Sequence, residues 1–186
     1  MPKKITIPVT DDAVVRGLKA GDEVLLTGRM FTARDAAHKR LCELLAKGEP
    51  LPVELKGAAI YYVGPSPARP GKVIGSAGPT TSGRCDPYTP QLLDQGVKIL
   101  VGKGKRNDAV KDALKKHGAA YLAATGGAAA LLAARIKDAK VVAYEDLGPE
   151  ALRELVVEDF PAVVVNDAAG GDAYVEGARK YNREDK

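Results

Sequence analysis

The sequence is poor in residues that bind metals. Among 186 residues there are only two Cys and two His, and there is no Trp. A self-contained zinc or iron–sulfur site usually needs three or four such ligands, and Cys42, Cys85, His38 and His117 are scattered without paired spacing. We therefore expect no metal centre held by this chain alone. Two Cys also argue against a disulfide framework, as in a protein of a reducing compartment.

Long hydrophobic runs are missing too. No segment approaches the roughly 18 consecutive apolar residues of a membrane-spanning helix, and the N-terminal MPKKITIPVT has no apolar stretch of signal-peptide length. We expect a soluble, cytoplasmic protein without a membrane partner. The chain has 28 Lys and Arg against 24 Asp and Glu, a net charge of +4. This excess is too small to indicate a nucleic-acid partner unless the cations cluster.

Glycine and proline, by contrast, are abundant, at 20 and 12 residues. Many glycines stand in short clusters between apolar runs, as tight loops at the ends of strands and helices require. In the first half, a helix over 31–47 is expected to begin at the N-cap Thr32, and a turn at Gly21-Asp22 separates the first two strands. The strands are predicted over 5–9, 23–26, 58–63 and 72–76.

The second half alternates regularly between strand and helix, and a charged tail follows. The predicted strands cover 97–101, 119–123, 141–144 and 162–165, and the predicted helices cover 89–96, 107–117, 128–136 and 149–155. Such alternation is typical of an α/β fold. We expect a single α/β domain over residues 1–186, with a mixed sheet as its core and helices on its flanks.

Two glycine-rich loops are candidates for anion binding. Gly78-Pro-Thr-Thr-Ser-Gly-Arg84 resembles a phosphate-binding P-loop, but Arg84 and Cys85 replace the lysine and the hydroxyl residue of the NTPase motif. Gly102-Lys-Gly104 follows a predicted strand and precedes a helix, as a dinucleotide fingerprint does, without the third glycine. Each loop taken alone is more simply explained as a tight turn.

Together the two loops predict one anion site. Both lie beyond the carboxyl ends of predicted strands, where α/β folds bind ligands, and they carry the cations Arg84 and Lys103. Arg34, on the apolar face of its helix, needs an anionic partner, which is either a ligand or a carboxylate such as Asp35. Three cations suit a small dicarboxylate, and Thr80 adds a hydroxyl for proton transfer. These residues supply the anion-binding groups and a hydroxyl of an active site, but the sequence shows no electrophile to complete it.

The ordered motifs of the chain resemble those of one family. They are GRMFTARDAAH over 28–38, GPTTSGRCD over 78–86, the Gly-Lys-Gly of 102–104 and HGAAYLAATGG over 117–127. They are similar to the iron–sulfur-dependent class I fumarate hydratases and the L-tartrate dehydratases. The similarity is to the β subunit, which corresponds to the C-terminal domain of single-chain members, and it covers almost the whole chain. It implies a swivelling β/β/α domain.

The resemblance also implies a cofactor, a partner and a reaction. A [4Fe–4S] cluster would be held by three Cys of a separate α subunit, with its open iron as Lewis acid, and two αβ pairs would form a dimer. Thr80 would be the catalytic base, assisted by a carboxylate of the α subunit. Arg34, Arg84 and Lys103 would bind the substrate carboxylates, with Lys105 as the alternative to Lys103. The implied reaction is the reversible hydration of fumarate to (S)-malate.

Two other functions stay open on the sequence alone. An L-tartrate dehydratase would use the same machinery on a different substrate. A non-catalytic module would bind anions or nucleic acid through Lys103, Lys105 and Arg106, although the aromatic residues needed for base stacking are few and not interleaved with these cations. We assign no role to Cys85, and we expect His38 to be half-buried rather than a metal ligand.

Overall fold

The computed structural model describes residues 1–125 and 127–183. Gly126 of the motif over 117–127 and residues 184–186 of the predicted tail lie outside the described residues. The strands are β1 (Lys3–Ile7), β2 (Glu23–Thr32), β3 (Ala59–Tyr61), β4 (Ile99–Gly102), β5 (Ala120–Ala123), β6 (Ile136–Ala143) and β7 (Leu152–Asn166). The helices are α1 (Asp12–Arg16), α2 (Asp35–Lys47), α3 (Thr89–Asp94), α4 (Asp108–His117), α5 (Ala129–Ala133) and α6 (Ala173–Tyr181), with 3-10 turns η1 (Ser82–Cys85) and η2 (Glu145–Glu150).

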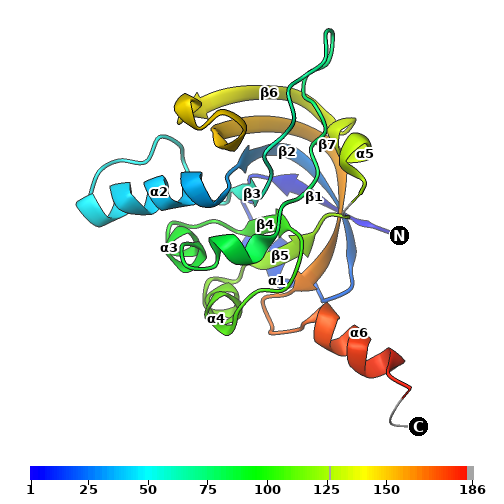
Figure 1. Cartoon of the computed structure of the whole chain (residues 1–186). Helices are drawn as coiled ribbons and strands as arrows, with labels where there is room; N and C mark the ends of the chain where they lie inside the picture. The colour runs from blue at the N-terminus through cyan, green and yellow to red at the C-terminus, as the bar shows by residue number, and fades with distance from the viewer. Residues whose placement is uncertain (126, 184–186) are drawn as a thin grey trace.

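The sheet closes on itself because β7 pairs along both of its edges. β2, β3, β4 and β5 run parallel to one another, and β7 runs antiparallel to both β5 and β2. These five strands form a barrel-like ring (Figure 1). β1 adds to β2 in parallel, and β6 adds to β7 in the antiparallel sense. The predicted α/β fold with a mixed sheet and flanking helices is confirmed.

Successive residues of the central strands face two different hydrophobic cores. In β4, Ile99 and Val101 pack inside the ring, whereas Leu100 packs on the outer side against the helices. This follows from the strand period of two, which sends neighbouring side chains to opposite faces. The outer core lies beneath α2, α3 and α4, which Figure 1 shows together on one side of the ring.

The first half of the chain departs from prediction at the start of α2. β2 continues to Thr32, because Phe31 and Thr32 pair with both β3 and β7. Thr32 therefore cannot be the N-cap: its Oγ1 donates to Ala151 O (3.3 Å). Arg34 occupies the N-cap position, and its side chain makes no capping hydrogen bond. The predicted turn at Gly21 is present directly before β2, and α1 also lies between β1 and β2, which are parallel.

The regular alternation predicted for the second half ends after β5. The helix predicted over 149–155 is wrong, because η2 ends at Glu150 and β7 begins at Leu152. The apolar residues of this segment belong to a 15-residue strand that pairs with β2, β5 and β6. The helix predicted over 128–136 is likewise shorter than expected, since Ile136 already begins β6.

Two exposed segments also differ from prediction. The stretch over 72–76 forms no strand but is part of an arm, residues 66–76, that projects past β6 (Figure 1). The predicted charged tail forms α6, which points away from the ring (Figure 1). In the described part of the chain, no helix combines the length and apolarity needed to cross a membrane. The single domain over 1–186 stays a prediction.

Candidate functional site

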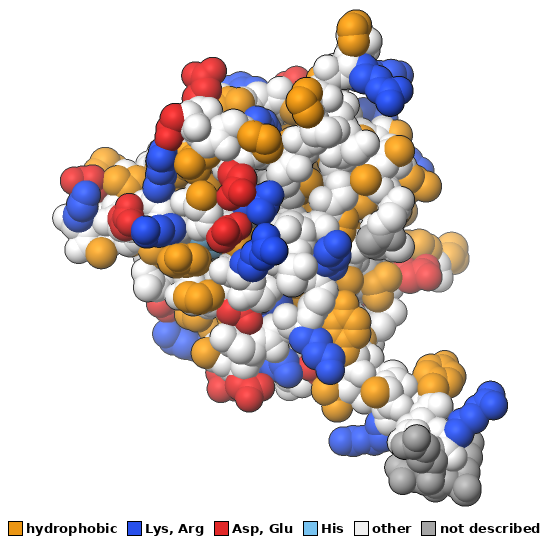
Figure 2. Space-filling model, viewed as in Figure 1, with side chains coloured by type: hydrophobic (Ala, Val, Ile, Leu, Met, Phe, Trp, Pro, Cys, Tyr) orange, Lys and Arg blue, Asp and Glu red, His pale blue; other side chains and the backbone are white. Residues whose placement is uncertain are grey.

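The predicted site residues lie beyond the carboxyl ends of neighbouring parallel strands. Arg34 follows β2, Lys103 follows β4, and Thr80 and Arg84 lie in the long connection from β3 to α3. Because these strands are parallel, their carboxyl ends meet at one edge of the sheet. Figure 2 shows acidic and basic side chains next to one another in the middle of the molecule, close to the start of α2.

Backbone hydrogen bonds join the two glycine-rich loops. Lys103 N donates to Thr80 O (3.3 Å), and Ser82 N donates to Lys103 O (2.9 Å). Thr80 N in turn donates to Tyr62 O (2.8 Å), just beyond β3. Gly102 permits this close approach, since a Cβ at that position would collide with Ser82 Oγ. The residues directly opposite each other in this bridge are Thr81 and Lys103, and Thr80 precedes Thr81 with its carbonyl bonded to the Lys103 backbone.

Exposed cations surround Thr80. Arg84 lies on η1 two residues after Ser82, and Arg84, Lys103 and Lys105 are all exposed, whereas Thr80 is partly buried. None of the three cations has a carboxylate partner among the residues that the structure describes. The surface around Thr80 can therefore accept an anion, and the Lys105 alternative stays open.

Arg34 stands among acidic side chains at the start of α2. Its Nη2 is 3.2 Å from Glu150 Oε1 and 3.7 Å from Asp35 Oδ1. Gly64, just beyond β3, leaves room for it: a Cβ there would lie 3.1 Å from Arg34 Cδ. Arg34 Nε is buried without a hydrogen-bond partner in the described residues. The ion pair with a neighbouring carboxylate is thus present, and the guanidinium faces Glu150 and Asp35.

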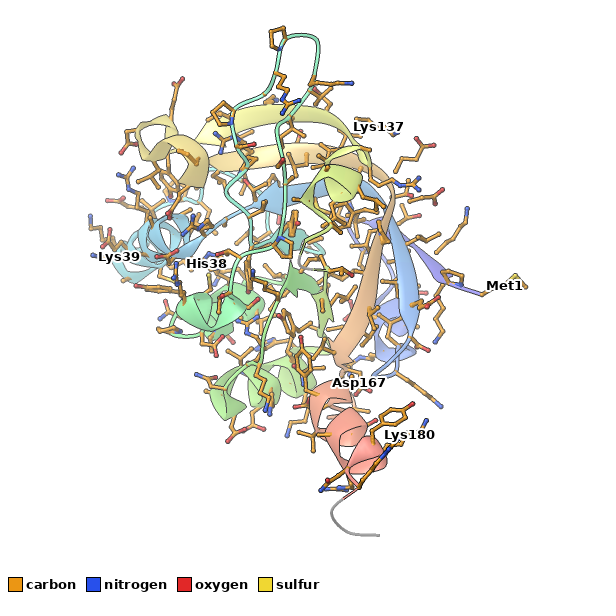
Figure 3. The ribbon with its side chains drawn as sticks, turned by 45° about the vertical axis from the view of Figure 1, so that its right-hand side comes forward. Met1, His38, Lys39, Lys137, Asp167 and Lys180 are labelled. Carbon is orange, nitrogen blue, oxygen red and sulfur yellow. The ribbon has the colours of Figure 1, made fainter. Side chains whose placement is uncertain are left out.

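His38 supports the start of α2 from within the protein. It is fully buried, not half-buried as expected, and Figure 3 shows it on the side of α2 facing the body, with Lys39 on the other side. Its Nδ1 lies 2.8 Å from Arg34 O, and because a carbonyl only accepts, Nδ1 carries the proton. Burial lowers the pKa of His38 to about 4. The ring is therefore neutral at pH 7 and holds the backbone of Arg34.

Arg106 is the main site-supporting residue that sequence reasoning missed. Only 3% of it is exposed. Arg106 therefore cannot belong to a basic surface with Lys103 and Lys105, and that part of the sequence interpretation is wrong. Arg106 Nε donates to Asp86 Oδ1 (2.6 Å), and its Nη2 donates to Thr89 Oγ1 (2.8 Å). This pair ties the loop after β4 to the segment that follows η1. Both sequence neighbours of Arg106 are exposed, so no local signal distinguishes it.

Aromatic rings complete the enclosure of Arg106. Its guanidinium carbon lies 5.1 Å from the ring centroid of Tyr62 and 4.8 Å from that of Tyr121, within the range of cation–π attraction. Tyr121 OH also bonds Ser82 Oγ (2.9 Å) and donates to Gly104 O (3.0 Å). Residues of β5 and of both glycine-rich loops therefore form one buried polar network beneath the exposed cations.

The described residues offer no ligand set for a metal cluster. No group of three or more His, Cys, Asp or Glu in them is arranged to hold a metal ion. Cys42 and Cys85 are buried free thiols, and burial raises the pKa of Cys85 to about 12, which opposes the thiolate that a metal requires. These residues do not fit a [4Fe–4S] cluster, which is held by thiolates. That a partner holds the cluster stays a prediction.

Fold and site together define a class of protein: a ring of strands with flanking helices that presents cations and a hydroxyl at the carboxyl ends of its parallel strands. Comparison with known families identifies the family within this class. The family described as Fumarase C-terminus matches residues 3–177, and the chain belongs to that family. The resemblance of its motifs to class I fumarate hydratases and tartrate dehydratase β subunits is confirmed by its relatives.

The relatives differ in how much of their length this chain covers. Fumarate hydratase 2 of Leishmania major is 45% identical over 156 residues, 83% of this chain and 28% of that protein. The aerobic class I fumarate hydratase of Escherichia coli K12 is 46% identical over 151 residues, which are 80% of this chain and 28% of that protein. A chain provisionally named L(+)-tartrate dehydratase subunit beta, from Methanocaldococcus jannaschii, is 38% identical over 172 residues, which are 89% of this chain and 88% of that protein. The chain thus spans little more than a quarter of these fumarate hydratases.

Proposed function

We propose that this chain is the β-type subunit of a cytoplasmic hydro-lyase that reversibly hydrates fumarate to (S)-malate. Its α-type partner would correspond to the part of the longer relatives that this chain does not match, and two αβ pairs would assemble. The observation that carries the proposal is the pair of joined loops, which bonds the backbone of Thr80 to that of Lys103 and carries Arg84 in the same loop as Thr80. The family membership supports it.

The cations bind and orient the substrate in this proposal. Arg84 and Arg34 would bind carboxylate oxygens, Arg34 by exchanging its ion pair with Glu150 for the substrate, with Lys103 as a point charge. Binding both carboxylates fixes the dicarboxylate in one orientation, with C3 next to Thr80. Such positioning converts the proton transfer into an effectively unimolecular step.

Thr80 would move the proton at C3. In the dehydration direction its Oγ1 would take the C3 proton while its own hydroxyl proton passes to a carboxylate of the α-type partner, and a Lewis acid supplied by that partner would accept the departing C2 hydroxyl. Hydration would reverse both transfers. A Thr hydroxyl is a weak base unless a neighbour activates it, and Thr80 Oγ1 has no hydrogen-bond partner in the described part of the chain. A carboxylate of the α-type partner would activate it. No step on this chain runs through the [4Fe–4S] cluster, which we assign to the partner.

L-Tartrate dehydration is the second candidate function. It is favoured by one observation: the chain covers 88% of the relative named as a tartrate dehydratase β subunit. The same cations would bind the two carboxylates of tartrate. Binding of nucleic acid has less support, because the burial of Arg106 breaks up the basic run on which it depended.

Anaerobic co-expression with the α-type chain tests the proposal. The complex should hydrate fumarate faster than it dehydrates tartrate, and this chain alone should be inactive and cluster-free. Thr80→Val should lower kcat by a factor of about 100 to 10,000, the usual contribution of acid–base catalysis. Thr81→Val, a matched change at the exposed neighbour, should stay within about threefold of wild type, as expected outside such catalysis.

Three results would change the assignment. Equal kcat for the Thr80→Val and Thr81→Val complexes would remove Thr80 as the base. Activity of this chain alone would contradict the division between two subunits. Faster turnover of tartrate would select the second candidate function.

A further inference from the structure

An arm and a short helix form an open groove beside the candidate site. The arm comprises residues 66–76, and α5 lies next to it in Figure 1. The groove between them has a volume of about 570 Å³. Its apolar lining includes Pro67, Val73, Ile74, Ala130, Ala133 and Ile136.

The base of the arm is fixed, whereas its tip has no cover. Ser66 N donates to Ser76 O (3.1 Å), and Ser76 N donates to Ser66 Oγ (2.8 Å). Residues 66–73 are all exposed, with Val73 49% exposed and Leu131 on α5 57% exposed. An exposed apolar patch on a segment whose base is fixed by hydrogen bonds is typical of a protein–protein interface.

Both ends of the arm run directly into the candidate site. On one side the chain reaches the arm from Gly64, which lies against Arg34. On the other side it leaves through Ala77, whose N donates to Ala129 O (3.2 Å), and reaches Thr80 three residues later. A partner that docks at the base of the arm would therefore lie next to the segment that carries Thr80.

We propose that the arm and α5 are the surface on which the α-type partner docks, closing the site over Thr80. This inference rests on the proposed function. More than two thirds of each longer fumarate hydratase relative lies outside the matched region, so the missing part is large enough to cover groove and site together. Arg84 and Lys103 are exposed, so a partner has room to cover the candidate site.

The composition of the arm indicates the chemistry of the docked surface. Arg69 and Lys72 are the only charged residues over 66–76, and both are cations. Figure 2 shows Lys or Arg side chains next to apolar ones at the projecting tip. The complementary surface is apolar at its centre, where it faces Val73 in the groove and the exposed Leu131 of α5 beside it, with acidic residues at its rim.

Two variants test the surface. Val73→Asp/Leu131→Asp places carboxylates in it without touching a site residue, and Val175→Asp on α6, where Val175 is 47% exposed, is the matched control. All the isolated chains should unfold at the same temperature. Affinity for the purified α-type chain, measured by sedimentation or calorimetry, should fall about 30-fold or more in the double variant, as for loss of two interface contacts, and should be unchanged in Val175→Asp. Excess partner should restore fumarate hydration to the double variant.

The possible failures are distinguishable. Wild-type affinity in Val73→Asp/Leu131→Asp overturns the docking surface, while an active wild-type complex leaves the proposed function intact. If the wild-type chain neither binds the α-type chain nor gains activity, the proposed function fails, and the docking inference fails with it. If the isolated chain self-associates and only the double variant does not, the arm is an interface between copies of this chain, which also overturns the inference.

Discussion

Removing the guanidinium of Arg106 should destabilise the loops that carry the candidate site. The Arg106 side chain is 0% exposed and that of its partner Asp86 is 7% exposed. Arg106 also donates to Thr89 Oγ1 and Tyr62 OH. In Arg106→Met a side chain of similar length carries no charge. The carboxylate of Asp86 would then stay buried without a cation, while its Oδ2 still accepts a hydrogen bond from Asn107 N (2.8 Å).

Breaking a buried ion pair from one side costs about 3–5 kcal/mol. In a chain of 186 residues, about 1 kcal/mol shifts Tm by roughly 2–4 °C, so Arg106→Met should lower Tm by about 6–20 °C in a calorimetric scan. Asp86→Asn/Arg106→Met removes both charges and should recover much of this loss. The control Lys105→Met alters an exposed side chain and should leave Tm nearly unchanged. An Arg106→Met Tm equal to that of Lys105→Met would refute the structural role of the pair.

Three further predictions concern a histidine, a cysteine and two lysines. Burial lowers the pKa of His38 from 6.5 to about 4, so the unfolded chain binds a proton there that the folded chain does not, and stability falls as the pH drops from 6.5 towards 4. Between pH 7 and pH 4.5, urea unfolding should show wild type losing about 2–3 kcal/mol more than His38→Gln; equal losses would contradict this. Cys85 is 0% exposed and should react with a thiol reagent at pH 8 only after unfolding, and modification of the native protein would disprove its burial. In the αβ complex, Lys103→Ala should raise KM for fumarate about tenfold or more and Lys105→Ala less, because Lys103 is bonded to the Thr80 segment; the reverse order would assign the contact to Lys105.

Elements with local signals were predictable from the sequence. For α4, Asn107 caps the first turn by accepting from Val110 N, and Gly118 ends the helix in the left-handed conformation. Both signals lie within the segment itself. β7 has no such signal: its length and position depend on pairing with β2, more than a hundred residues earlier. The helix predicted over 149–155 failed for that reason, since local patterns do not include strand pairing.

Some residues of the candidate site were likewise predictable from local sequence, and others were not. Thr80, Arg84 and Lys103 stand in glycine-rich loops after strands, and the sequence alone brings them into one hypothesis because parallel strands end at one edge. The pairing of Arg34 with Glu150 could not be predicted, because it depends on where η2 sits against α2. The burial of Arg106 likewise depends on aromatic rings from separate parts of the chain.

The central claim is that cations of this chain bind the substrate of a hydratase. It is tested most directly by kcat/KM for fumarate in the assembled complex carrying Arg84→Ala, compared with Arg179→Ala at an exposed position on α6. Loss of one charge partner costs about 2–5 kcal/mol, so Arg84→Ala should lower kcat/KM by a factor of about 30 to several thousand. Arg179→Ala should match wild type. Equal kcat/KM in the two variants would contradict the account.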